Sequence, residues 1–457
     1  MKARSILTVL FAVVALPCRS QTPPKATFVS LTEAQPSLAV YGDALPEELR
    51  RTKPLDEAGW AKWIQQSDQE VRKRLIQGQE DTLSNLLRFG VTYTKEYRID
   101  DEYLPKYGES SLVNSFAENR ANDLVKALAS PQAKEGFREM RGFVEKQGYS
   151  FQTPAERLRV KKYLLANLAR LREDFLKARS EEARENRWQA FEQRGISLDT
   201  NLWPDYSVDA HLRALLEKGV LKPSSIRKVA VVGPGLDFVN KQEGYDFYPP
   251  QTIQPFAVLD TLFRLKLADP ATAELYTLDI SSDVNLHIER IRKEAAAGKP
   301  YVLELPWYSA GRWTEEFRAK FVSYWESLGS AIGQPVSAVK VPEGAGGIDI
   351  RAIEVRPAVV KRVTPLDLNI VYQRLDLAPE ERFDLIIGTN VFIYYGAFEQ
   401  SLVRLNVARM LRPGGFLLSS EKLADRIENG LATDLTTEIT MTGPPVMTDY
   451  IFGYRRN

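Results

Sequence analysis

One stretch near the middle of the chain limits the possible folds more than any other. Residues 229–232 are four small apolar residues, and Gly233, Pro234 and Gly235 end the run abruptly. A run that is apolar on both faces needs cover on both sides, which is typical of a central strand in a parallel sheet. Ligands of open α/β sheets bind outside the carboxyl ends of such strands, where glycines let the backbone approach them. A tight strand-to-helix turn is the alternative interpretation of Gly-x-Gly.

Three later stretches follow the same pattern. The stretch Glu274–Asp279 ends in a carboxylate, which is where a nucleoside-binding sheet places the side chain that holds ribose hydroxyls. Residues 383–390 are a second run that ends at Asn390, and residues 402–411 predict a helix that leads through Arg-Pro-Gly-Gly into a last apolar run. Strands that alternate with helices in this way predict an α/β fold.

Together these motifs resemble the class I S-adenosylmethionine-dependent methyltransferases over residues 226–456. The most specific pieces are the first strand with its glycine loop, the strand over residues 383–390, and the turn Leu-Arg-Pro-Gly-Gly-Phe at 411–416. Residues 389–395, Thr-Asn-Val-Phe-Ile-Tyr-Tyr, are most similar to the chemotaxis-receptor glutamate methyltransferases. The resemblance implies a doubly wound, Rossmann-like sheet that ends in an antiparallel hairpin, expected over residues 436–441 and 446–454, and S-adenosylmethionine as cofactor.

The resemblance also assigns site residues. The glycine loop, Asp279 with the following Ile280, and Asp376 near the adenine amino group would bind the cofactor, whereas Asn390 would lie where the methyl group is presented. Tyr394 and Tyr395 are candidates to orient the acceptor, and at least one of them is expected in the core. The expected cofactor-binding residues are Val232, Gly233, Pro234, Gly235, Asp237, Asp279, Ile280, Asp376 and Asn390, and the expected catalytic residues are Asn390 and Tyr395.

Two of these assignments have alternatives. Asp237 stands where the superfamily usually has a third glycine, and the aromatic segment 244–250 after it is either a lid over the pocket or a surface loop held by its own side chains. Asp279 could instead cap the helix expected near Val284.

The start of the chain predicts export. Lys2 and Arg4 precede an apolar run over residues 6–16, which is too short to span a bilayer, so residues 1–20 are interpreted as a signal peptide that is cleaved before Gln21. An uncleaved, membrane-anchoring leader is the alternative. Cys18 is the single cysteine, so the mature protein would contain no disulfide and no thiolate site. Residues 21–45, rich in proline and small polar residues, predict a tether.

The remaining boundaries follow from hydrophobic periodicity. Residues 46–222 predict an all-α region, in which Thr153 and Glu156 form a capping box, and residues 223–457 predict the methyltransferase-like domain. Within that domain, residues 299–368 are longer than the usual connection and predict an insertion with a strand, a helix and a hairpin. Residues 370–376 are expected to resume the sheet. The two histidines, His211 and His287, are expected on helix surfaces.

The functional expectation is methyl transfer from S-adenosylmethionine to an oxygen or nitrogen acceptor, which is a small molecule or a protein carboxylate. The net charge of +1 and the lack of a basic stripe argue against nucleic acid, and no His-Glu-x-x-His motif indicates a metal. Because S-adenosylmethionine is made in the cytosol and the leader predicts export, the alternative is a methyltransferase-like module that has lost catalysis and serves as a binding or scaffold protein. The oligomeric state is left open.

Overall fold

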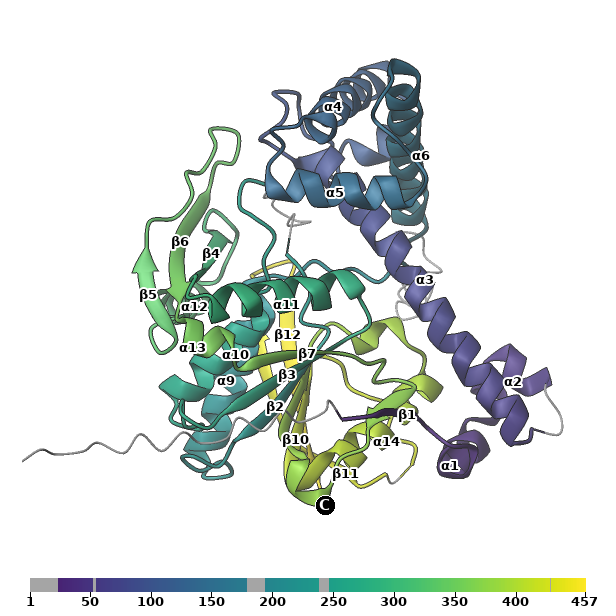
Figure 1. The fold of residues 1–457 in the computed structure, drawn as a ribbon, viewed down its shortest axis with the longest axis vertical. Coiled ribbons are helices and arrows are strands. Elements are labelled where there is room, and N and C mark those ends of the chain that lie inside the picture. Colours follow the sequence, from purple (N-terminus) through teal and green to yellow (C-terminus); the bar gives the residue numbers. More distant parts are fainter. Residues whose placement is uncertain (1–23, 52–54, 179–193, 238–245, 428) are drawn as a thin grey trace, which may run out of the picture.

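The computed structural model describes residues 24–51, 55–178, 194–237, 246–427 and 429–457. A helical part and an α/β part lie next to each other, and the long helix α3 (Glu57–Phe89) runs along both (Figure 1). The predicted signal peptide, residues 1–20, lies outside the described residues.

The α/β part is built on a seven-stranded sheet in the order β11-β12-β10-β9-β2-β3-β7. Neighbouring strands from β10 to β7 are parallel, whereas β12 is antiparallel to both β10 and β11. The strands are β2 (Lys228–Val232), β3 (Glu274–Asp279), β7 (Val363–Asp367), β9 (Phe383–Gly388), β10 (Leu411–Ser419), β11 (Leu431–Thr440) and β12 (Thr448–Arg456). This mixed sheet with helices agrees with the predicted α/β fold, and β11 begins earlier than the sequence indicated.

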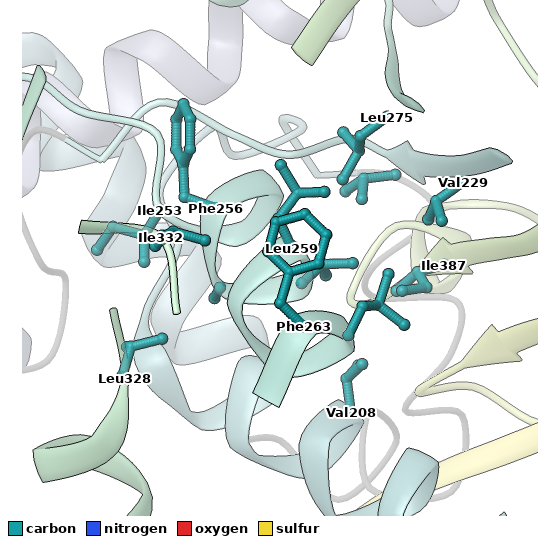
Figure 2. Close-up of a cluster of buried hydrophobic side chains, with 14 of the residues drawn as sticks. Val208, Val229, Ile253, Phe256, Leu259, Phe263, Leu275, Leu328, Ile332 and Ile387 are labelled. Atoms are coloured by element: carbon teal, nitrogen blue, oxygen red, sulfur yellow. The ribbon is translucent and has the colours of Figure 1, made fainter. Parts of the chain in front are cut away.

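Strand β2 is buried on both faces, as its sequence predicts. Val229 and Val231 pack into the core under α9 (Leu202–Glu217), α10 (Gln254–Arg264) and α11 (Ser282–Ala296). Ala230 and Val232 pack on the other face, against α14 (Ala397–Met410) and the first half of α3. Figure 2 shows the first of these cores, in which Phe256, Leu259 and Phe263 of α10 belong to the same cluster as Val229 and Ile387 of the sheet.

The helical part has a separate core. The second half of α3 packs with α4 (Ser111–Ala129), α5 (Glu135–Lys146) and α6 (Pro154–Ala178). Thr153 and Glu156 exchange hydrogen bonds at the start of α6, which confirms the predicted capping box. The predicted boundary at residue 222 is wrong, because α9 contacts α10, β11 and β12 and so belongs to the α/β part.

The insertion forms a small sheet beside the main one. Its strands β4 (Tyr301–Tyr308), β6 (Ile348–Val355) and β5 (Gly333–Val336) are antiparallel in that order, and α12 (Glu315–Ser327) links β4 to β5. The predicted end of the insertion at 368 is wrong, because α13 (Pro357–Val360) leads into β7 of the main sheet. Pro365 inside β7 concealed that strand, and a proline is tolerated there because β7 is an edge strand.

The segment after β7 does not resume the main sheet, contrary to the prediction for residues 370–376. Strand β8 (Gln373–Leu375) pairs instead with β1 (Ala26–Phe28) in a separate two-stranded sheet. The predicted tether over residues 21–45 is therefore also wrong over its described residues, since they include β1 and the helix α1 (Leu31–Tyr41); α2 (Glu47–Arg51) follows. Ser30 and Glu33 form a capping box at α1, and the Glu33 carboxylate binds the Arg374 guanidinium at 2.7 Å. This partner is too distant in sequence for a local pattern to reveal it.

Candidate functional site

The first candidate site is a cavity at the carboxyl ends of β2, β3 and β9, called here the strand-end cavity. Its empty space is about 910 Å³, a volume that includes the solvent at its open mouth. Four regions of the main sheet line it: the end of β2 with its glycine loop, the end of β3, the residues that follow β7, and the residues that follow β9. Of the nine predicted cofactor-binding residues, six line this cavity: Val232, Gly233, Gly235, Asp279, Ile280 and Asn390.

The glycine loop adopts the conformation that its sequence suggests. Gly233 and Gly235 have φ angles of +60° and +73°, which side chains other than glycine rarely tolerate. A Cβ atom on Gly233 would lie 2.7 Å from the Val391 side chain. A Cβ atom on Gly235 would lie 2.5 Å from the carbonyl oxygen of Leu198. Gly235 is therefore needed because the backbone of Leu198 passes close to it. The sequence had instead suggested that this glycine allows the close approach of a ligand.

Two other residues of the predicted loop do not line the strand-end cavity. Pro234 is buried. Asp237 is also buried, its backbone pairs with Gln251 in both directions, and its carboxylate accepts a hydrogen bond from the Tyr248 hydroxyl at 3.0 Å. Asp237 thus closes the loop that follows, and its assignment as a cofactor-binding residue is not supported by its position.

The segment predicted to be either a lid or a surface loop is described only from Asp246 onward. Asp246 accepts hydrogen bonds from the backbone N–H groups of Val91 and Thr92, just after α3. The rings of Phe247 and Tyr248 are buried and pack around Ala345 of the insertion. These residues therefore join the helical part to the insertion and do not cover the strand-end cavity, while residues 238–245 lie outside the described residues.

Asp279 ends β3 and is 5% exposed. Its Oδ1 atom accepts the backbone N–H of Ser281 at 2.7 Å, and the hydroxyl of Ser281 in turn caps α11 by accepting from Val284. The helix cap is thus Ser281, and Asp279 supports the turn before it while also lining the cavity. The pKa of Asp279 is raised to about 7, chiefly by burial and also by the carboxylate of Asp367, while the N–H groups of Ser281 and Gly235 act in the opposite direction.

The residues after β9 form the mouth of the cavity. Asn390 is exposed with a φ angle of +57°, and its backbone N–H donates to the Ser420 hydroxyl at 2.7 Å. Tyr395 lines the cavity, but its ring is buried in the core and its burial raises the pKa of the phenol. The Tyr394 hydroxyl accepts the backbone N–H of Ser197 at 3.4 Å. One tyrosine is in the core, as expected, and the other supports the roof of the cavity.

Asp376, predicted near the adenine, does not line the cavity. It lies with Lys228 and Phe383, the first residues of β2 and β9, at the opposite edge of the sheet. The error follows from the misplaced strand, because β7 and not β8 belongs to the main sheet. The residues that occupy the expected place follow β7 and are Leu368, Asn369 and Ile370.

The helix α3 and a segment before α9 form the roof of the cavity. This segment, residues 195–201, is called the strap. It is held by α3, since the N–H of Ile196 donates to the carbonyl of Arg74 and the Thr82 hydroxyl donates to Asp199. Gly78 allows this approach, because a Cβ atom there would lie 1.8 Å from the Ile196 oxygen. The strap was missed in the sequence, where only the glycines of an otherwise helical pattern hinted at a close contact.

Arg72 ties α3 to the strand ends. Its guanidinium donates to the backbone oxygen of Ile280 at 3.1 Å and forms an ion pair with Asp367 at 2.8 Å. A third contact, with Asp68 at 3.1 Å, connects to Asn369, whose amide donates to the same carboxylate. The helical part is thus fixed to the ends of β3 and β7 by charge-assisted bonds.

Two buried carboxyl groups lie close to the cavity. Glu421 follows β10 and accepts a hydrogen bond from the Ser420 hydroxyl at 2.8 Å, and the same hydroxyl contacts Asn390. Asp205 lies in α9 beside Gln254, whose amide donates to Thr389 at the cavity wall. Burial raises the pKa of both carboxyl groups to about 7. Perturbed groups of this kind are functional candidates, and neither was singled out from the sequence.

The histidines are buried, which corrects the expectation of surface positions. His211 is fully buried and its Nδ1 atom lies 2.8 Å from the Thr437 hydroxyl, and His287 contacts the Tyr301 hydroxyl. Burial lowers their pKa values to about 4 and about 3, so both are neutral near pH 7. Among the described residues there is no group of His, Cys, Asp and Glu that could hold a metal ion. Nor does any helix in that part of the chain have the length and apolar character to cross a membrane.

Comparison with known proteins gives weak likenesses. No family model matches the sequence, and no curated protein matches it. Among solved structures, the N-methyltransferase NodS from Bradyrhizobium japonicum WM9 with S-adenosyl-L-homocysteine shares 12% identity and a TM-score of 0.26 over 59% of this chain and 97% of that one. The magnesium protoporphyrin IX methyltransferase ChlM from Synechocystis PCC 6803 shares 13% identity and a TM-score of 0.27 over 60% of this chain and 91% of that one. The glycopeptide N-methyltransferase MtfA shares 13% identity and a TM-score of 0.22 over 54% of this chain and 75% of that one.

Proposed function

We propose that this protein binds S-adenosylmethionine in the strand-end cavity and transfers its methyl group to an oxygen or nitrogen acceptor. The carrying observation is that a glycine loop and the buried carboxyl group of Asp279, at the ends of adjacent parallel strands, line one cavity. In open α/β sheets this is where a nucleoside-containing ligand binds.

The polar groups of the cavity fit such a ligand. Oδ1 of Asp279 supports the turn at Ser281, and the carboxyl group is suited to accept ribose hydroxyl groups. Hydroxyl donors stabilise the ionised carboxylate, so binding would lower the pKa of Asp279 from about 7. The Thr200 hydroxyl in the roof is buried and has no hydrogen-bond partner within the described part of the chain, so a ligand could satisfy it.

The closing strands separate this proposal from a nicotinamide-dependent dehydrogenase. Strand β12 inserts antiparallel between β10 and β11, whereas a dinucleotide-binding sheet would end in parallel strands. An antiparallel hairpin at the end of the sheet is what the resemblance to class I methyltransferases implies. The proposal therefore rests on the sheet and the cavity of this chain and not on the weak likenesses to solved structures.

The chain's own groups would act mainly by position. When bound, the cofactor would supply an electrophilic methyl group on a sulfonium. Leu75 and the strap, which form the roof of the cavity, would exclude water from the bound cofactor. Asn390 and Tyr394 would border the mouth through which an acceptor reaches the methyl group. We assign the role of general base to Glu421, because its carboxylate accepts a hydrogen bond from the Ser420 hydroxyl, which contacts Asn390 at the mouth, and burial raises its pKa to about 7.

For the acceptor we propose an oxygen or nitrogen nucleophile, and a carboxylate is the specific class suggested by the sequence of residues 389–395. A carboxylate is already ionised near neutral pH and needs no base. An amine or a hydroxyl group needs to lose a proton, so replacement of Glu421 by glutamine separates the two classes. Turnover that is unaffected by Glu421→Gln favours the carboxylate, and turnover that falls about 100-fold favours the amine or hydroxyl.

Calorimetric titration with S-adenosylhomocysteine tests cofactor binding. Asp279→Ala should weaken the affinity about 10- to 100-fold, because a carboxylate that accepts ribose hydroxyls contributes about 1.5–3 kcal/mol. Asp376→Ala is the matched control, since this carboxylate lies at the opposite edge of the sheet and its loss should leave the affinity unchanged. Equal affinities for the Asp279→Ala variant and the parent would refute the assignment.

A binding module without catalysis remains the second candidate function. The observation in its favour is that the tyrosines expected to orient an acceptor are engaged elsewhere, Tyr395 in the core and Tyr394 with the strap. The two functions share the cofactor cavity and differ in turnover. Incubation of the protein with methyl-labelled S-adenosylmethionine and fractions of the native host should yield a labelled product and S-adenosylhomocysteine if the protein is an enzyme, and neither if it is a module.

A further inference from the structure

A second cavity lies where the helical part meets α11, and it is called here the interdomain cavity. It holds about 980 Å³ of empty space, including its open mouth. Its walls come from α3, α5 and α11, and the strap residues Leu198 and Asp199 separate it from the strand-end cavity, because both residues line both cavities. No role in the proposed methyl transfer uses this space.

The interdomain cavity has an apolar wall. Met140 and Phe143 of α5 and Leu236 of the glycine loop are buried and line it. Leu286 of α11 lies at its rim with 60% of its surface exposed, although it is a large hydrophobic residue. Hydrocarbon surface of this kind favours a ligand with an apolar body, because burying such a body removes apolar surface from water.

The charged groups in the cavity leave one carboxylate weakly compensated. Asp283 binds Lys146 at 3.1 Å and accepts a hydrogen bond from Gln79 at 2.7 Å. Arg290 pairs closely with Glu135 and reaches Glu139 only at 3.9 Å. The cationic side chains are therefore already held by other carboxylates, and Glu139 has the longest ion-pair contact of the group.

The electrostatics of Glu139 agree with this geometry. The pKa of Glu139 is raised to about 7, chiefly by burial and also by the neighbouring carboxylates of Glu135 and Asp283, while Arg290 acts in the opposite direction. His287 at the same wall adds no positive charge near pH 7, because burial lowers its pKa to about 3. A cation brought beside Glu139 would favour its ionised form.

We propose that the interdomain cavity binds a small organic ammonium ion with an apolar body, whose charged nitrogen meets Glu139 and whose hydrocarbon lies on Met140 and Phe143. The lining holds three carboxylates, Glu139, Asp199 and Asp283, against two cationic side chains, so an anion of the same size is disfavoured. The site is independent of the cofactor, and its ligand need not be the methyl acceptor.

Calorimetry with 2-phenylethylammonium tests this proposal on the full chain at pH 8 without cofactor. We expect saturable binding with a Kd of about 1 mM or below, and no binding of 3-phenylpropionate, which has a similar body and the opposite charge. Glu139→Gln should weaken binding about tenfold or more, because it removes the charge that the ammonium meets. Glu145→Gln, at an exposed position on the same helix, is the control and should bind like the parent.

Three outcomes would overturn the proposal: equal affinity for the ammonium and the carboxylate, equal affinity of the Glu139→Gln variant and the parent, or no saturation at about 10 mM ammonium. Melting curves of both variants show whether they are folded. Titration of the same variants with S-adenosylhomocysteine distinguishes the two sites. Both variants should bind it like the parent, because neither glutamate lines the strand-end cavity. Failure at the interdomain cavity therefore leaves the cofactor proposal standing, and the reverse is also true.

Discussion

Replacing Asp279 by asparagine should stabilise the ligand-free protein at alkaline pH. Burial raises the pKa of Asp279 from 3.8 to about 7 in the folded protein. In the unfolded chain the Asp279 carboxyl group loses its proton near pH 4, whereas in the folded protein it stays protonated up to about pH 7. The free energy of unfolding of the parent therefore falls as the pH rises from about 4 to about 7. Each pKa unit corresponds to about 1.4 kcal/mol, so the loss above pH 7 is at most about 4 kcal/mol. Asparagine keeps an oxygen for the Ser281 N–H and cannot ionise.

Urea denaturation of parent and variant at pH 5 and pH 8, without ligand, measures this effect. The advantage of the Asp279→Asn variant should grow by about 2 to 3 kcal/mol between the two pH values. The same variant should bind S-adenosylhomocysteine more weakly than the parent. An advantage that is equal at pH 5 and pH 8, or a variant that is less stable at pH 8, would refute the reasoning that burial keeps this carboxyl group protonated.

Three further predictions follow from the contacts around the cavity and from the leader. Gly235→Val should lower the free energy of unfolding by at least about 2 kcal/mol, because the new Cβ atom would collide with Leu198 and because valine rarely adopts the positive φ angle of this residue. An unchanged melting temperature would contradict this. Arg72→Ala should destabilise the protein by about 1–3 kcal/mol in urea through loss of its bonds to Ile280 and Asp367, whereas Arg51→Ala, at an exposed surface pair, should change little. Protein from the native host should begin near Gln21 by intact-mass measurement, and retention of Met1 would sink the export proposal.

The parts of the fold that rest on local patterns could be predicted from the sequence. The apolar run of β2 needs cover on both faces, and the structure places its side chains alternately in two cores. The strand end at Asp279 and the capping box at Thr153 are set by residues within a few positions of one another. Local sequence patterns were therefore sufficient to predict these features.

The errors came from contacts between residues far apart in the chain. The segment around Ala26 is a strand only because β8 pairs with it, so its composition alone suggested a tether. Pro365 disguised β7, and the shift of the third strand carried Asp376 to the wrong edge of the sheet. The roof of the cavity depends on Gly78 meeting Ile196 across more than a hundred residues, which no periodicity can indicate.

The most direct test of the central claim, that the strand-end cavity holds S-adenosylmethionine, is backbone hydrogen exchange of the full chain with and without saturating S-adenosylhomocysteine. The account predicts slower exchange in segments 233–235, 278–280 and 389–395, which contribute lining residues to the cavity. Residues 373–377, at the opposite edge of the sheet, should exchange at an unchanged rate. Protection at residues 373–377 alone, or no protection at any of the three cavity segments, would contradict the claim.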